Sequence, residues 1–331
     1  MHDDDYVPVR DEDYTYAVAR IRSNERILLS NQNIEQLMAS ANEEECLKLL
    51  IEKGWGDGTQ SDSEALLSFE SERTWKLIHE VAPDMAPFRI LLLSMDYNNL
   101  KAVIKSKLET NDPQNVLIEG GSVPLKTIQT AISEKRYSML PDAHMEIAAK
   151  TAYEAFIQTA DGQICDAILD RACLRAMLDA GEQSGNEMLA EYAELVVAIA
   201  NIKIAVRSCK VHKDMAFIRS AVVPCKTLAE GQLVQAAARD IDAVFAYLAV
   251  TPYAKAAEAL KNSYSAFEKW CDDKIMSLIK GEKLNFFSVG PLFAYAVARQ
   301  NEINMTRIIL AAKRSGLDQE IIRERQRDMY V

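Results

Sequence analysis

The chain has 331 residues, of which 49% are apolar, so it is long enough to bury a substantial core or to form a repeat array. Its 49 Asp and Glu residues exceed its 38 Lys and Arg residues, which gives a net charge of −11. That field repels polyanions, and no Lys/Arg stripe with interleaved aromatic residues offsets it, so nucleic acid is not an expected partner.

The N-terminal segment, MHDDDYVPVRDEDY, is acidic and lacks the apolar region of a signal peptide. The most apolar run, residues 195–200, is broken by Asn201 and Lys203, far short of the ~18 apolar residues of a membrane-spanning helix. The six cysteines form no C-x-x-C pair and lie mostly in apolar helical patterns, as reduced core cysteines do. We therefore expect a soluble, cytoplasmic protein without a transmembrane span, which can still dock on a membrane-bound partner.

Apolar residues at helical spacing dominate the chain, and no stretch alternates long enough to predict a sheet. The proline-free segment 142–180 is longer than a usual globular helix, so it predicts either one long helix or two stacked helices. A second apolar stripe runs from Leu189 to Val206. Glycines at 54–58, 120–121, 281 and 290 mark the clearest breaks. The predicted fold class is all-α.

A short phrase occurs twice, as VPLKTI at residues 123–128 and as VPCKTL at 223–228. An Asn-apolar-Lys motif precedes each copy, and its lysine stands 23 residues before the first proline and 21 before the second. A fainter third copy, TRIIL, places Arg307 at the position of that lysine. Repetition at about 100 residues predicts three copies of one helical unit, each with a loop and then a proline near the next helix start.

Lys101, Lys203 and Arg307 occupy the same position in the three copies. One interpretation is that they are ordinary solvated ends of amphipathic helices. The other is that they line one shared surface, such as a central lumen, that faces acidic or dipolar groups of a partner. The sequence leaves both open, and the second makes these three residues the candidates for a partner interface.

No motif predicts a catalytic, cofactor-binding or metal-binding residue. His79-Glu80 begins like H-E-x-x-H, but Pro83 replaces the second histidine. Asp272-Asp273 lacks the D-D-x-x-D of an Asp-rich all-α synthase, because Met276 stands where the third aspartate is required, so a solvated acidic face is expected there. No phosphate-binding loop of the G-x-x-x-x-G-K-[ST] type occurs, so the isolated chain is not expected to bind ATP.

Three stretches resemble a known family: YTYAVARIRSNERILLS at residues 14–30, DYNNLK at 96–101, and the C-terminal 42 residues, which include RIIL and close with IRERQRDMYV. Together they are similar to the C subunit of V-type (A/V-type) ATPases and ATP synthases, the counterpart of the d subunit of the eukaryotic V-ATPase, over nearly the full length. The sequence departs from the family at Met305, where asparagine is common, and keeps the Asn-[Leu/Ile]-Lys motif at 99–101 and 201–203.

The resemblance implies three similar helical units around a pseudo-three-fold axis, forming a funnel. We place the boundaries at 1–90, 91–190, 191–285 and 286–331, with the last segment closing the ring with the first. It also implies a non-catalytic subunit without cofactors, which sits on the proteolipid ring of the membrane rotor and receives the foot of the central stalk. Such a subunit links ATP hydrolysis or synthesis to proton or sodium transport, and is peripheral on the membrane through the complex.

The alternative is a generic helical-repeat scaffold without a rotary role. Such scaffolds repeat every ~34–47 residues, whereas the period here is about 100 residues. The period therefore favours the rotary subunit.

Overall fold

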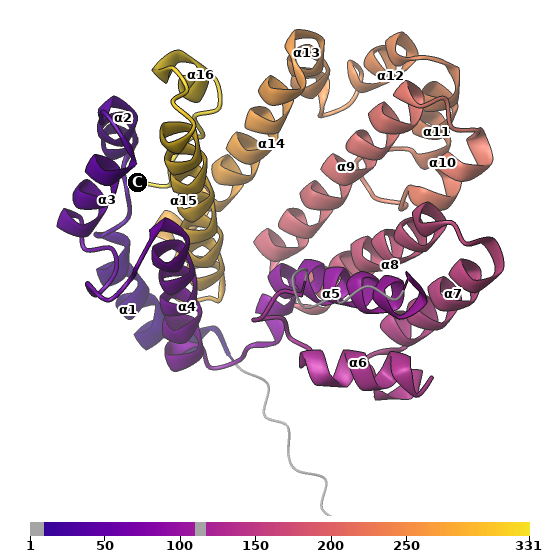
Figure 1. Ribbon diagram of the computed structural model, residues 1–331, viewed down its shortest axis with the longest axis horizontal. Coiled ribbons are helices and arrows are strands. Elements are labelled where there is room, and N and C mark those ends of the chain that lie inside the picture. The colour runs from indigo at the N-terminus through magenta and orange to yellow at the C-terminus, as the bar shows by residue number, and fades with distance from the viewer. Residues whose placement is uncertain (1–9, 110–116) are drawn as a thin grey trace, which may run out of the picture. The chain divides into compact units, whose positions relative to one another are not determined.

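The computed structural model describes residues 10–109 and 117–331 (Figure 1). Throughout these residues the regular elements are helices and no strand occurs, which confirms the predicted all-α class. The chain forms two compact units. Unit 1 comprises the chain up to Met85 together with Lys255–Val331, and unit 2 comprises Ala86–Ala254. The finer division at residues 90, 190 and 285, and the closure about a three-fold axis, stay predictions.

Unit 1 combines helices from both parts of the chain that form it. The first part holds η1 (Asp11–Tyr14), α1 (Thr15–Glu25), α2 (Asn31–Ala39), α3 (Glu43–Glu52) and α4 (Ser63–Val81). The second part holds α13 (Ala254–Asn262), α14 (Tyr264–Ile279), η5 (Lys280–Leu284), α15 (Gly290–Arg314) and α16 (Gln319–Arg323). Figure 1 shows α15, in dark yellow, between α4 and α14, and it packs against both.

The central helix of unit 1 is α15. Pro291 lies in its first turn, where the missing N–H of proline has no helical partner to lose. The next seven residues, LFAYAVA, are apolar and all buried, and the helix packs against α1 as well as α4 and α14. Farther along, Ile303, Met305 and Ile309 share a hydrophobic core with α2 and α3. A helical segment that is apolar on every side, as residues 292–298 are, is expected to be buried. Because α15 packs against helices from both parts of the chain, it holds the two parts of unit 1 together.

Unit 2 is a continuous run of helices. They are η2 (Ala86–Phe88), α5 (Arg89–Glu109), α6 (Leu125–Ser133), η4 (Tyr137–Met139), α7 (Ala143–Thr159), α8 (Gly162–Gln183), α9 (Glu187–Lys210), α10 (Met215–Ala221), α11 (Glu230–Arg239) and α12 (Ile241–Leu248). Both α5 and α7 pack against α8, which in turn packs against α9 (Figure 1). Tyr97, Phe156 and Leu169 lie in the core that these helices share.

The proline-free segment 142–180 forms two stacked helices, α7 and α8, rather than one long helix. The break lies at Ala160, whose φ of 51° is in the left-handed region. Asp161 then caps α8 by accepting a hydrogen bond from the Gln163 N–H at 2.8 Å. Because the break needs neither proline nor a helix-ending glycine, sequence periodicity alone could not separate the two alternatives.

Small polar residues define most of the other helix starts. A side chain accepts a hydrogen bond from a first-turn N–H at Ser30, Asn42, Asp62, Asp142, Asn186, Asp214, Asp240 and Ser263. Each such cap satisfies a backbone donor that has no partner within the helix, and stabilises the helix by about 1 kcal/mol.

A buried polar side chain on each of three long helices holds a loop. Asp96 of α5 accepts a hydrogen bond from the Val123 N–H at 3.0 Å. Asn201 of α9 accepts one from the Val223 N–H, also at 3.0 Å. Glu302 of α15 accepts one from the Leu29 N–H. In two of the three cases the donor stands two residues before a helix, α6 or α2. We term this contact, in which a buried polar side chain of a long helix binds a loop N–H, the loop clamp. In two of the three cases the loop residue is the valine of the repeated Val-Pro phrase.

The repeated asparagines complete the loop clamp. Asn201 also donates to the Val223 carbonyl at 2.7 Å, so it binds both polar groups of one residue. Asn99 binds Ile118 in the same two-sided way, with both distances 2.8 Å. Gly121 is required nearby, because a Cβ at this position would clash with Asp96 Oδ1.

The two Val-Pro phrases lead into different structures. Pro124 is the N-cap residue of α6, as the sequence predicted. The corresponding prediction for Pro224 was wrong, because an irregular segment with a bend at residues 226–228 follows it and α11 begins only at Glu230. The N–H and the hydroxyl of Thr227 both donate to Glu194 Oε1 at 2.7 Å, and these bonds hold the segment in a non-helical conformation.

Candidate interaction surfaces

Lys101 lies on α5 and forms an ion pair with Asp170 of α8. Its side chain is only 18% exposed, and its Nζ lies 3.4 Å from Asn98 Oδ1. Because this ion pair joins two helices that pack together in unit 2, Lys101 contributes to internal packing.

Lys203 and Arg307 have fewer partners. Lys203 lies half-buried on α9 and has no ion-pair partner in the part of the chain that the structure describes. Arg307 is exposed on α15, in unit 1, and its guanidinium lies 3.5 Å from Glu64 Oε2 and 3.3 Å from Asn304 Oδ1. A surface shared by all three stays a prediction, and Arg307 is the one most available to a partner.

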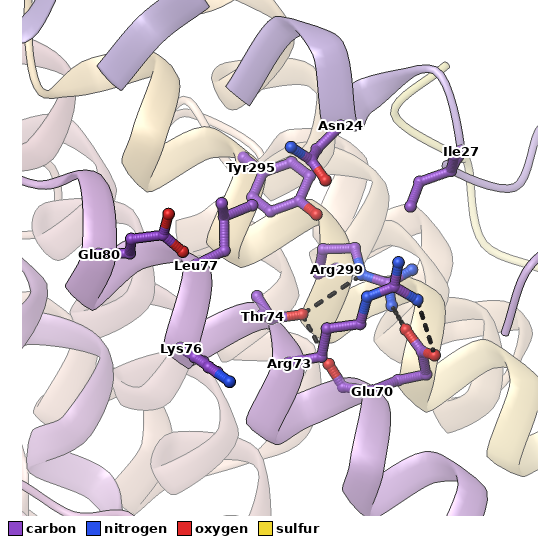
Figure 2. Close-up of a pocket in the computed structure, with 10 residues that line it drawn as sticks. All are labelled: Asn24, Ile27, Glu70, Arg73, Thr74, Lys76, Leu77, Glu80, Tyr295 and Arg299. Atoms are coloured by element: carbon purple, nitrogen blue, oxygen red, sulfur yellow. Dashed lines mark hydrogen bonds and ion pairs between the residues drawn. The ribbon is translucent and has the colours of Figure 1, made fainter. Parts of the chain in front are cut away.

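A buried ion cluster in unit 1 surrounds Arg299 of α15 (Figure 2). The guanidinium forms ion pairs with Glu70 of α4 and with Glu302, and its Nε–H donates to Thr74 Oγ1 at 3.3 Å. The Trp55 ring centroid lies 5.1 Å from the guanidinium carbon, close enough for a cation–π contact. No sequence pattern indicated this cluster, because its members are spread over almost the whole chain.

The cluster borders a small cavity of about 170 Å³, which Tyr295, Arg73 and Lys76 also line (Figure 2). Burial raises the pKa of Glu302, and it raises the pKa of Tyr295 to about 12, so this hydroxyl is protonated at neutral pH. Glu70 accepts a further hydrogen bond from the Gly56 N–H at 2.7 Å. Both carboxylates of the cluster, Glu70 and Glu302, are therefore engaged by donors from several parts of unit 1.

The pentapeptide YAVAR occurs twice, at residues 16–20 and 295–299, and its two copies have different environments. In α15 its tyrosine and arginine, Tyr295 and Arg299, are both buried. In α1 the corresponding Tyr16 is exposed, and Arg20 forms a surface ion pair with Glu80 at 3.3 Å. The shared pentapeptide therefore does not give the two helices the same contacts.

An exposed apolar loop joins η5 to α15 and forms what we term the 284–287 tip. Leu284 is 83% exposed, Phe286 51% and Phe287 58%. The two phenylalanine rings stand edge to face with centroids 6.3 Å apart. Single exposed apolar residues are common, whereas three within four residues form an apolar patch of the kind that is found where proteins contact other molecules.

The 284–287 tip is held in place by polar contacts at its base. Arg22 of α1 donates to the carbonyls of Glu282 at 2.6 Å and of Asn285 at 2.9 Å. The Asn285 amide donates to Glu282 Oε2 at 2.8 Å and to Ser288 Oγ at 2.7 Å. A rigid loop loses little conformational entropy on binding, so the tip is preorganised for contact.

The side chains of the acidic pair Asp272-Asp273 are 46% and 30% exposed, in partial agreement with the predicted solvated face, and they also make contacts within unit 1. Asp272 Oδ2 accepts a hydrogen bond from Arg327 Nε at 2.6 Å, and Asp273 Oδ1 accepts one from the Asp328 N–H at 2.7 Å. The pair therefore binds the segment after α16 to α14. The described residues include no group of three or more His, Cys, Asp or Glu side chains placed to hold a metal ion. Within the same residues, no helix has the length and hydropathy needed to cross a membrane.

The model of the ATP synthase (C/AC39) subunit family matches residues 17–325. The chain belongs to this family. It is therefore a non-catalytic subunit of a rotary ATPase complex, as the sequence resemblance implied.

Individual relatives match over almost their whole length. The C subunit of the V-type sodium ATPase of Enterococcus hirae is 24% identical, with 94% of this chain and 97% of that protein aligned. The C subunit of the A-type ATP synthase of Methanocaldococcus jannaschii is also 24% identical, with 94% and 85% aligned. That of Thermococcus kodakarensis is 22% identical, with 94% and 89% aligned.

Proposed function

We propose that this chain is a central-rotor subunit that joins the central stalk to the membrane rotor ring. In this role it transmits rotation, so that ATP hydrolysis or synthesis is linked to proton or sodium transport. The family match across residues 17–325 carries the proposal. The protein would be peripheral on the cytoplasmic side of the membrane and attached through the proteolipid subunits of the ring.

The loop clamp supports the accompanying proposal of similar units through two of the three copies, since in the second copy Ala198 stands at the corresponding position and Asn201, two residues before Lys203, holds the loop instead. Asp96 of α5 and Glu302 of α15 each stand five residues before a basic candidate, Lys101 or Arg307, and each holds a loop N–H. In the third case the loop comes from the N-terminal part of the chain, as expected if residues 286–331 complete a unit with residues 1–90. Repeated units that present equivalent surfaces would suit a socket for a stalk.

The experiment that tests this function is recovery of partners from native membranes with the full chain as bait. Recovery of central-stalk and proteolipid subunits is expected, and their absence from the wild-type sample would contradict the proposal. The isolated chain should show no ATP binding by calorimetry, because it has no loop of backbone N–H groups for phosphates.

The 284–287 tip provides a sharper prediction within the same assay. The double substitution Phe286→Ser/Phe287→Ser should leave the melting temperature nearly unchanged, since exposed substitutions shift stability by only about 0.5 kcal/mol. Recovery of partner subunits should fall, because the variant loses an apolar contact surface. Val250→Ser is the control, since Val250 is a large exposed apolar residue in unit 2 with no other large exposed apolar residue beside it in sequence. Equal recovery by the double variant and the control would show that the tip makes no contact in the complex.

A further inference from the structure

Unit 1 has a second hollow, of about 270 Å³, between the last turns of α15 and α16. We term it the α15–α16 groove. It is lined by Arg307, Ile308, Ala311, Ala312, Ser315, Leu317, Ile321, Ile322 and Arg325. On α15 these residues recur at helical spacing and form one stripe, so the groove runs along the helix rather than across it.

The groove combines a narrow floor with apolar walls. Ala311, Ala312 and Ser315 are small, which lets another backbone approach α15 closely. Leu317 and Ile321 are 43% and 42% exposed, so their side chains are only partly buried in unit 1 and can contact another molecule. The volume lies below the ~300–1,000 Å³ of pockets for small-molecule ligands. It fits one or two side chains of a partner better than a cofactor.

The charged side chains that line the groove are both positive. Of the described residues that line it, two are arginines and none is acidic. Arg325 has no ion-pair partner among the residues that the structure describes, and Arg307 reaches its one carboxylate, Glu64, only at 3.5 Å. This local charge contrasts with the net charge of −11 of the whole chain. A ligand with carboxylates beside apolar groups would complement it.

We propose that the α15–α16 groove binds an amphipathic helix of a partner protein, with an apolar residue in the hollow and flanking carboxylates on Arg307 and Arg325. A helix is the fitting form because a groove between two helices accepts another helix by its apolar stripe. The identity of the partner rests on the proposed function: the acidic helix would belong to the central stalk. In this proposal Arg307, a candidate for a partner interface, belongs to a site defined by the residues that line the groove.

The first arm of the test uses the full chain and synthetic helices. A dye-labelled amphipathic peptide with a leucine stripe flanked by glutamates should bind, as measured by fluorescence anisotropy. The same peptide with lysines in place of the glutamates should bind at least about tenfold more weakly. Arg325→Glu and Ile321→Asp should each weaken the acidic peptide by about tenfold or more, while Arg219→Glu, an equal charge change in unit 2, should not. Equal binding of both peptides, or no effect of Arg325→Glu, would overturn the proposal.

The second arm separates this proposal from the proposed function by recovering partners from membranes with Arg307→Glu/Arg325→Glu. Loss of stalk subunits, with helix content and melting temperature retained, supports the groove as the stalk site. Undiminished recovery overturns the groove and leaves the rotor function standing. If the wild type recovers no part of the stalk, the rotor function fails and the peptide arm alone decides on the groove. Two results together would overturn the proposal in favour of a lipid surface. The wild type would sediment with anionic vesicles while the double variant would not, and the acidic and basic peptides would bind equally well.

Discussion

Replacing Arg299 by methionine is expected to lower the free energy of unfolding of unit 1 by about 3–5 kcal/mol, the usual effect of removing one partner of a buried ion pair. The substitution would leave Glu70 and Glu302 buried without the cation that both contact. All three tryptophans, Trp55, Trp75 and Trp270, lie in unit 1. Tryptophan fluorescence during urea unfolding therefore reports on this unit.

The control for Arg299 is the arginine of the other YAVAR segment. Arg20→Met removes an exposed ion pair with Glu80 and should cost less than about 1 kcal/mol. Adding Glu302→Gln to Arg299→Met should restore part of the lost stability, because glutamine is neutral and still accepts the Leu29 N–H. A loss below about 1 kcal/mol for Arg299→Met would show that water reaches and screens the cluster.

The loss should also depend on pH. Burial raises the pKa of Glu302, and Arg299 opposes that rise, so its removal should raise the pKa further. A carboxyl whose pKa is higher in the folded than in the unfolded state stabilises the fold when protonated, and this contribution is lost as the pH rises through the folded pKa. The difference between Arg299→Met and the wild type should therefore be smaller at about pH 5 than at about pH 8.

The second large effect is expected at the loop clamp of unit 2. Asn201→Ala should cost about 2–4 kcal/mol, because it leaves the N–H and the carbonyl of Val223 without partners. Val223 is 1% exposed, so water cannot replace the asparagine there. Asn99→Ala removes the same pair of bonds from Ile118, which is 42% exposed, and should cost only about 1 kcal/mol.

Far-UV circular dichroism during urea unfolding measures this difference, because unit 2 contains no tryptophan. The tryptophan transition of unit 1 provides an internal reference in the same sample. If Asn201→Ala and Asn99→Ala lowered the free energy of unfolding by the same amount, the exposure of the residue that each asparagine binds would not determine the size of the effect.

Much of the fold could be predicted from local sequence patterns. Helical periodicity indicated the all-α class, since one apolar stripe per helix is enough to define the element. The repeated Asn-apolar-Lys motif pointed to equivalent positions, although its physical role was not visible. Lys101 and Lys203 were chosen for their charge, whereas the buried asparagines beside them, Asn99 and Asn201, make the contacts that hold the loops.

Other features depend on contacts between distant residues and could not be predicted in this way. The cluster around Arg299 joins residues from opposite ends of the sequence, and Glu194 determines the conformation after Pro224 from another helix. The 284–287 tip did carry a local signal, because Leu284, Phe286 and Phe287 are apolar residues just before the Gly-Pro helix start. The α15–α16 groove had no local sequence signal. Its apolar residues follow the same helical spacing as buried ones, and only the exposure of Leu317 and Ile321 in the structure distinguishes them.

The discontinuity of unit 1 has a consequence for how the chain folds during synthesis. Helices α1 to α4 leave the ribosome long before α15, the helix that buries their apolar faces. At about 5–20 residues per second, the interval between α4 and the end of α15 is on the order of 10–50 s. Unit 2 is contiguous and can fold during this time, whereas the first helices of unit 1 must wait with apolar surface exposed. Nascent chains of this protein should therefore depend on chaperones chiefly through their first 85 residues.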